Sequence, residues 1–271
     1  MKNIFLFFAS LMLILSAACA PKQVSPTATN NITLTVMAAA SLTESFSQLG
    51  LQFEDAHRGV TVQFNFTGSQ QLALQLSQGA PADVFASANQ VQMDAAVKTG
   101  RVDASAEHIF AQNKLVVVYP VANPGKLATL ADLTNPGLKI SLANREVPVG
   151  LYTIDFLDKA VKDPQYGAGY ETGVLKNVVS FENSVKGVLT KVVLGEADAG
   201  VVYTTDITGD AVSQVSRIEI PDALNVIAVY PIAALKDSPN QEMAKAFVDM
   251  VLSAQGQSLL ANYGFMGPTG N

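Results

Sequence analysis

The sequence predicts an α/β protein, and two observations support this fold class. From residue 32 onward, short strand-like apolar runs alternate with longer segments that have apolar residues at helical spacing. Apolar residues make up 49% of the chain, enough for a sizeable core even without Trp. Strands that alternate with helices build parallel sheets through right-handed crossovers. The 240 residues from 32 to 271 suffice for one large domain or two smaller lobes.

The first part of the chain is predicted to contain three strand–helix units. Strands are expected at residues 32–38, 60–66 and 82–86, where apolar residues are continuous or alternate. Helices are expected around residues 46–53, 72–79 and 90–99. Gly100 is a stop signal for the third helix. This βαβαβα order indicates a parallel sheet.

The second part has a less regular order. Strands are predicted at residues 115–120, 138–142, 199–203 and 226–231, and helices at residues 149–161, 185–193, 242–252 and 255–263. Two of the strands end in Tyr-Pro, at Tyr119-Pro120 and Tyr230-Pro231. We interpret each of these two strands as marking a crossing between two α/β lobes, with the last helices returning to the first lobe. A single large α/β domain would give a similar pattern.

The first 18 residues are predicted to be a signal peptide. Lys2 precedes an apolar stretch at residues 4–15, which is shorter than the roughly 20 residues of a membrane-spanning helix. The segment Ser16-Ala-Ala-Cys19 contains the only cysteine and resembles a lipobox. We expect Cys19 to carry lipid, and residues 19–31 to form a flexible tether. The alternative is an ordinary cleavage site followed by an incidental cysteine.

Several function classes lack their sequence signals. The formal net charge is −6 and there is no basic run, which argues against nucleic acid as a partner. No Cys/His cluster, glycine-rich phosphate loop or nucleophile elbow is present. His57 and His108 are isolated among polar residues and are interpreted as solvated surface residues. Asp83 is interpreted as a strand-end residue that bonds neighbouring backbone N–H groups, rather than as an acid or base.

Four predicted helix starts provide the strongest functional signal. A helix N-terminus offers unpaired N–H groups and a partial positive charge, so it can bind an anion. Lys186 is the only cationic side chain at these starts, which favours a small, fully deprotonated oxyanion bound by neutral dipoles. The candidate residues, with a tyrosine at the end of strand 199–203, are Ser41, Ser69, Val149, Val185 and Tyr203.

Each candidate also has an ordinary structural interpretation. Ser41-Leu-Thr-Glu44 is a capping-box pattern, so Ser41 could serve only as a helix cap, and Ser69 could be another N-cap. Val149 and Val185 could be apolar residues at helix starts. Tyr203 could be a half-buried core aromatic.

Six segments together resemble the molybdate-binding protein of bacterial ABC uptake systems. They occur in the family's order, cover the chain from about residue 32 to 265, and are Ala38-Ala-Ala-Ser-Leu-Thr43, Gly79-Ala-Pro-Ala-Asp-Val-Phe85, Leu115-Val-Val-Val118, Val147-Pro-Val-Gly-Leu-Tyr152, Val185-Lys-Gly187 and Gly200-Val-Val-Tyr203. The resemblance implies a two-lobed type II periplasmic-binding-protein fold. Each lobe would be a mixed, mostly parallel sheet flanked by helices, with the ligand in the cleft between lobe 1 (residues 32–113 and 230–271) and lobe 2 (residues 114–229).

The resemblance also implies a site and a function. Ser41 and Ser69 would bind the anion through hydroxyl and backbone N–H, Val149 and Val185 through backbone N–H, and Tyr203 through its hydroxyl. The protein would capture molybdate or tungstate and deliver it to an ABC permease. It would be an extracytoplasmic monomer anchored to the membrane by lipid on Cys19. It would not be an enzyme, would need no cofactor, and would hold molybdenum only as molybdate.

The chemistry of these anions agrees with such a site. Molybdate and tungstate are tetrahedral dianions that offer only hydrogen-bond acceptors, and a site made of donors satisfies them. Two alternatives remain open from the residues. One is a binding protein of the same fold for another solute, such as sulfate, phosphonate or ferric ion. The other is a serine hydrolase that uses Ser41 or Ser69, although neither histidine lies in a motif that suggests pairing with a serine.

Overall fold

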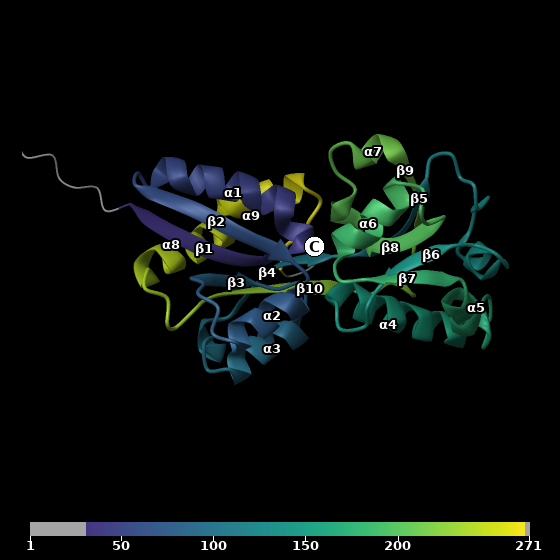
Figure 1. Ribbon diagram of the computed structural model, residues 1–271, viewed down its shortest axis with the longest axis horizontal. Helices are drawn as coiled ribbons and strands as arrows, with labels where there is room; N and C mark the ends of the chain where they lie inside the picture. The colour runs from purple at the N-terminus through teal and green to yellow at the C-terminus, as the bar shows by residue number, and fades with distance from the viewer. Residues whose placement is uncertain (1–30, 269–271) are drawn as a thin grey trace, which may run out of the picture. The chain divides into compact units, whose positions relative to one another are not determined.

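Two five-stranded sheets organise residues 31–268, the part of the chain that the computed structural model describes (Figure 1). The first sheet has the order β2-β1-β3-β10-β4 and the second β7-β6-β8-β5-β9. The strands of the first sheet are β1 (Ile32–Ala39), β2 (Val60–Thr67), β3 (Val84–Ala86), β4 (His108–Asn113) and β10 (Ala228–Ala234). Those of the second are β5 (Leu115–Pro120), β6 (Ile140–Ala143), β7 (Val178–Glu182), β8 (Ala199–Tyr203) and β9 (Val215–Glu219). We call the halves built on these sheets the first and the second domain.

Strand direction makes both sheets mixed and mostly parallel, as the family resemblance implied. In the first sheet β10 runs antiparallel to both of its neighbours, β3 and β4, while β1 runs parallel to β2 and β3. In the second sheet β5 runs antiparallel to β8 and β9, while β6 runs parallel to β7 and β8. One strand in each sheet therefore opposes the other four, and it occupies the same place in both.

The chain crosses between the sheets at these two opposing strands. It leaves the first sheet after Asn113, begins β5 at Leu115, and returns between β9 and β10. Tyr119-Pro120 lies at the far end of β5, which already pairs with Tyr203 from Leu115 onward, so the chain passes between the sheets just before this strand and not at its Tyr-Pro dipeptide. Tyr230-Pro231 coincides with a register shift in β10, because proline has no N–H to donate. The domain boundaries at residues 113/114 and 229/230 stay a prediction.

Helices flank both sheets. Those of the first domain are α1 (Thr43–Ala56), α2 (Ser69–Ser77), α3 (Gln90–Lys98), α8 (Gln241–Leu252) and α9 (Ala254–Asn262). Those of the second are α4 (Pro148–Lys162), α5 (Tyr170–Lys176), α6 (Val185–Val193) and α7 (Ala211–Gln214). The short 3-10 helices are η1 (Ala40–Leu42), η2 (Ala104–Ala106), η3 (Leu130–Thr134) and η4 (Thr204–Asp206). The last two helices return to the first domain, where α8 packs on β10 and α9 on α1 (Figure 1).

Aromatic contacts join these elements in the first domain. The ring of Phe247 on α8 lies 5.3 Å from that of Phe53 and 6.0 Å from that of Phe46, both on α1. Such buried aromatic pairs add specific geometry to the burial of apolar area. The core therefore fixes α1, and with it the segment that enters α1 from β1.

Asp83 has the structural role that the sequence predicted. Its Oδ2 accepts the backbone N–H of Thr35 at 2.6 Å, and its Oδ1 accepts the hydroxyl of Ser238. The side chain is buried, and these bonds tie the start of β3 to β1 and to the segment before α8.

Within residues 31–268, no helix is both long enough and apolar enough to cross a membrane. The predicted signal peptide and Cys19 lie outside the described residues, as does the predicted tether apart from Asn31.

Candidate functional site

One pocket brings together all five candidate residues. Its lining is Ala39, Ala40, Ser41, Gly68, Ser69, Ala88, Val147, Pro148, Val149, Val185 and Tyr203. These residues end or follow β1, β2 and β3 in the first domain and β6, β7 and β8 in the second. Ligand sites of open α/β sheets lie at this carboxyl end of the strands. The cavity is small: the centre of a water-sized sphere can occupy about 10 Å³ of it, far below the roughly 300–1,000 Å³ of pockets for drug-sized molecules.

The two serines do not cap helices, so the capping interpretation of both was wrong. Ser41 lies in η1, and the N-cap of α1 is Leu42, without a side-chain bond. The inserted 3-10 turn moves the start of α1 beyond the serine. Ser69 is the first residue of α2, whose N-cap is Gly68. Both serines are almost fully buried at the pocket, with exposed fractions of 3% and 1%.

The second domain presents backbone N–H groups at two helix starts. Pro148 is the first residue of α4 and has no N–H, so Val149 provides the first donor of that helix. On α6 the N-cap is Ser184, whose hydroxyl accepts the N–H of Gly187 at 3.2 Å. This cap serves the third residue of the helix and leaves the N–H of Val185 outside the intrahelical ladder. Both valines line the pocket, so these donors lie next to it at helix ends with partial positive charge.

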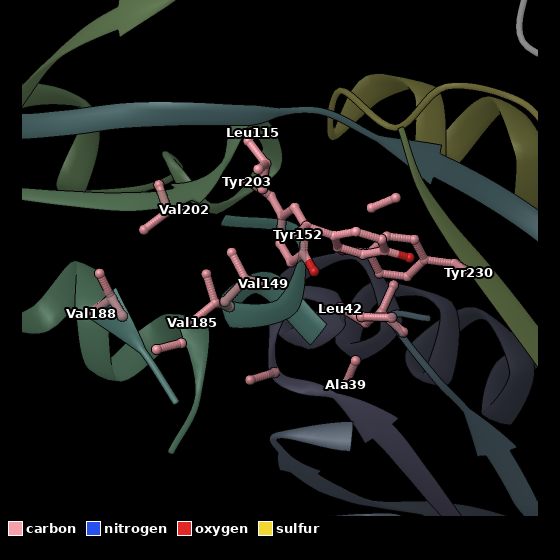
Figure 2. Close-up of a cluster of buried hydrophobic side chains, with 14 of the residues drawn as sticks. Ala39, Leu42, Leu115, Val149, Tyr152, Val185, Val188, Val202, Tyr203 and Tyr230 are labelled. Carbon is pink, nitrogen blue, oxygen red and sulfur yellow. The ribbon is translucent and has the colours of Figure 1, made fainter. Parts of the chain in front are cut away.

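Tyr203 provides the last candidate donor. The residue is 1% exposed at the end of β8, and its hydroxyl has no hydrogen-bond partner among the described residues. Burial raises the pKa of Tyr203 well above the usual range, so the hydroxyl keeps its proton. Figure 2 shows its ring beside those of Tyr152 and Tyr230, near Val149 and Val185. A core aromatic would satisfy its buried hydroxyl within the protein, so an unpartnered one at a pocket calls for a ligand acceptor.

Lys186 does not add a free positive charge to the pocket. Its Nζ lies 2.8 and 2.9 Å from the two carboxylate oxygens of Glu44 and 3.7 Å from Oδ1 of Asp206. Asp206 is fully buried, and its Oδ2 accepts the N–H of Tyr203 at 3.0 Å. Two carboxylates therefore neutralise this lysine, and the five candidate groups that line the pocket are neutral donors.

Helices of the first domain make three of the contacts that join the domains around the pocket. The Glu44–Lys186 pair links α1 to α6. The Nε2 of Gln70 donates to the carbonyl of Asn183 at 2.9 Å, and that of Gln92 to the carbonyl of Glu146 at 3.1 Å. All three helices of the first domain that precede β4 thus contribute one contact to the second domain.

Asp206 gives the protein a distinctive pH dependence. Burial raises its pKa to about 6, against the opposing effects of Lys186 and of the Tyr203 N–H. Because the pKa of Asp206 in the folded protein exceeds the usual 3.8, the folded state binds this proton more tightly than the unfolded state does. The free energy of unfolding therefore falls as pH rises from about 4 to about 6.

In Asp206→Asn we expect this loss, roughly 3 kcal/mol for a shift of about two pKa units, to disappear. Urea unfolding at half-unit steps from pH 4 to pH 7 measures it as the difference between the two stability profiles. Parallel profiles for variant and wild type would contradict the raised pKa.

Sequence reasoning did not identify several residues that surround the five candidates. Tyr230 and Asn113 contact each other behind Ser41, and Ala88 bonds Ser69. Asn113 and Tyr230 lie 117 residues apart, and no sequence pattern connects them. Pro148 was part of a family-like segment, and its missing N–H was the signal that could have marked Val149 as the first donor of its helix.

The two-domain fold and the small donor-lined pocket are those of a solute-binding protein. The sequence model described as "Bacterial extracellular solute-binding protein" matches residues 34–266, and the chain belongs to this family. The chain is 42% identical over 235 residues to the molybdate-binding protein ModA of Mycobacterium tuberculosis, a match that covers 87% of this chain and 85% of the relative.

Two solved structures show the same fold. The periplasmic molybdate-binding protein of Azotobacter vinelandii matches with a TM-score of 0.73 and 22% identity, over 86% of this chain and 98% of that one. The sulfate-binding protein SubI of Mycobacterium tuberculosis matches with a TM-score of 0.78 and 21% identity, over 87% of each chain. The predicted periplasmic-binding-protein fold is thereby confirmed. The family consists of binding proteins, so the prediction that the chain is not an enzyme is confirmed as well, and the serine-hydrolase alternative is dropped. Molybdate, in the names of these relatives, is a ligand rather than a cofactor.

Proposed function

We propose that this protein captures molybdate, and also tungstate, outside the cytoplasmic membrane and delivers it to an ABC permease. The observation that carries the proposal is the unpartnered, protonated hydroxyl of Tyr203 at a pocket whose other candidate groups are donors. A group that accepts hydrogen bonds on every side and carries no proton fits such a pocket. The ModA relatives, which are named for molybdate binding, support this choice among the oxyanions.

Selectivity follows from the size and protonation of the anion. Sulfate and phosphate are smaller than molybdate, so in a cavity of fixed size some donors would remain too far from their oxygens. Phosphate also carries a proton near neutral pH, and none of the five candidate residues offers a carboxylate to accept it. Each bond to a dianion in a buried site is charge-assisted and stronger than a neutral one.

In this proposal the protein is secreted and attached to the membrane by lipid. Residues 1–18 direct secretion, and lipid on Cys19 holds the protein at the membrane through the tether of residues 19–31. The lobes are residues 32–113 with 230–271 and residues 114–229, and the protein acts as a monomer. The family of extracellular solute-binding proteins is consistent with this location.

Calorimetry with a panel of anions tests the proposed ligand. Molybdate and tungstate should bind the purified protein far more tightly than sulfate, phosphate or chromate at the same pH and ionic strength. Tyr203→Phe should weaken molybdate binding by about 10- to 150-fold, because it removes one hydrogen bond to a charged acceptor, worth about 1.5–3 kcal/mol.

Tyr263→Phe is the matched control, since Tyr263 does not line the pocket, and it should bind as the wild type does. Tightest binding of sulfate would assign the site to that anion instead. Unchanged molybdate affinity in Tyr203→Phe would place the anion elsewhere.

A further inference from the structure

The side-chain amide of Asn113 has only one possible orientation. Its Oδ1 lies 2.9 Å from the backbone N–H of Lys114 and also accepts the hydroxyl of Thr204 at 3.0 Å. A backbone N–H can only donate, so the oxygen must face Lys114. The Nδ2 then faces Thr205 Oγ1 at 2.7 Å and Tyr230 Oη at 3.4 Å. Asn113 is 1% exposed, so solvent does not compete for these bonds.

This orientation determines where the proton of Tyr230 points. The hydroxyl of Tyr230 accepts from Asn113 and lies 3.0 Å from Ser41 Oγ, its other hydrogen-bond partner within 3.5 Å among the described residues. Burial raises the pKa of Tyr230 well above the usual range, so the hydroxyl stays protonated and donates to Ser41. The Ser41 oxygen then acts as the acceptor of this bond, and its own proton remains for the pocket that it lines.

The oxygen of Ser69 also accepts a hydrogen bond, in this case directly from a backbone N–H. The backbone N–H of Ala88 lies 3.0 Å from Ser69 Oγ and can only donate to it. The Ser69 hydroxyl proton is therefore also left for the pocket. The two sites differ in one respect. No substitution can turn the backbone N–H of Ala88 into an acceptor, whereas a substitution at Asn113 can reverse the hydrogen bonds that lead through Tyr230 to Ser41.

We infer that Asn113 and Tyr230 are positioning residues that turn the Ser41 hydroxyl into a donor toward the bound oxyanion. The inference rests on the proposed function and deepens it by naming residues that act on the anion only through Ser41. If these hydrogen bonds were reversed, Ser41 would donate its proton to Tyr230 and present an oxygen lone pair to the anion.

Asn113→Asp, a substitution of nearly the same shape, tests the direction of these hydrogen bonds. It places an acceptor where Nδ2 lies, so Tyr230 donates to Asp and Ser41 donates to Tyr230. Molybdate affinity should fall both from the added negative charge and from the loss of the Ser41 donor. Loss of the Ser41 donor alone should lower the affinity about 10-fold or more, which corresponds to one hydrogen bond to a charged group. In a Ser41→Ala background only the charge effect should remain.

The measurement is a double-mutant cycle, with molybdate dissociation constants from calorimetry at pH 7.5. Asn113→Asp raises the dissociation constant by some factor in each background. That factor should be at least about 10 times greater when Ser41 is present than in Ser41→Ala. A merely structural role would give the same factor in both backgrounds, and that result would overturn the inference. If Ser41→Ala alone binds as the wild type does, the proposed site itself fails, so the two failures are distinguishable.

Tyr230→Phe provides a second cycle that adds no charge. Loss of the donor to Ser41 should weaken molybdate binding by about 2- to 5-fold, because chains of hydrogen bonds strengthen one another. In Ser41→Ala the same substitution should change affinity by less than about 1.5-fold, as expected for a group that acts only through the serine. An equal loss in both backgrounds would overturn the inference even if Asn113→Asp fails to fold, a condition that circular dichroism identifies.

Discussion

Val185→Pro should lower molybdate affinity by about 100-fold or more while the protein remains folded. The substitution deletes a backbone donor to a charged acceptor, worth about 1.5–3 kcal/mol, and places the proline ring where the anion would lie. Val185 is the first residue of α6, the helical position that tolerates proline. Ser184 already has φ −156° and ψ 161°, the extended geometry that a following proline requires. Calorimetry measures the affinity, and circular dichroism and ligand-free melting check the fold.

Val185→Ala is the matched control because it also removes the valine side chain but keeps the N–H. The side chain is only 4% exposed, so the control should lose about 1–2 kcal/mol of stability through the cavity it leaves. Its molybdate affinity should nevertheless stay within about threefold of the wild type, since the backbone donor is intact. Equal affinities for the proline and alanine variants would show that the start of α6 does not contact the anion.

Gly150→Ala should destabilise the protein by about 1–3 kcal/mol and weaken molybdate binding at the same time. A Cβ at this position would lie 2.0 Å from the carbonyl oxygen of Asn144 and 2.7 Å from that of Ala143. Both atoms belong to the backbone that leads from β6 into α4, so the helix start must move away from that segment. Because Val149 is the preceding residue of α4, its N–H would move with the helix start.

Gly267→Ala is the control for glycine loss in general, since a Cβ there meets no atom within 4 Å. Urea unfolding should find it within about 0.5 kcal/mol of the wild type, the range of ordinary surface changes. A Gly150→Ala protein with wild-type stability and affinity would mean that α4 can shift without disturbing the pocket.

The elements that the sequence predicted have either a continuous buried face or, as in β2, apolar residues at alternate positions. Central strands such as β8 are buried at every residue, and α6 and α8 bury residues at helical spacing. The missed strands β4, β7 and β9 are all edge strands. Polar residues interrupt or bound their short apolar stretches (HIFAQN, VVSFE and VSRIE), so no apolar run longer than three residues marks them. The seven residues of α5 span too few turns to show a helical period.

The candidate site could be predicted from the sequence where it depends on local segments. A helix start after a strand can be recognised from a few neighbouring residues, and four of the five candidates belong to such segments. Whether Ser41 caps a helix could not be decided, because the 3-10 turn that separates it from α1 depends on packing against distant residues. The roles of Asn113 and Tyr230 were inaccessible for the same reason: their partners lie on β4, β10 and η1, which only the fold brings together.

The three contacts that helices of the first domain make with the second domain have a consequence for the affinity of the site. Gln70, Gln92 and Glu44 bond residues of the second domain, so they contribute to the free energy of this arrangement separately from any ligand. An apparent dissociation constant equals the intrinsic one divided by the fraction of molecules in the binding-competent arrangement. An exposed contact worth about 1 kcal/mol changes that equilibrium about fivefold. Affinity can therefore be tuned by substitutions at residues that do not line the pocket.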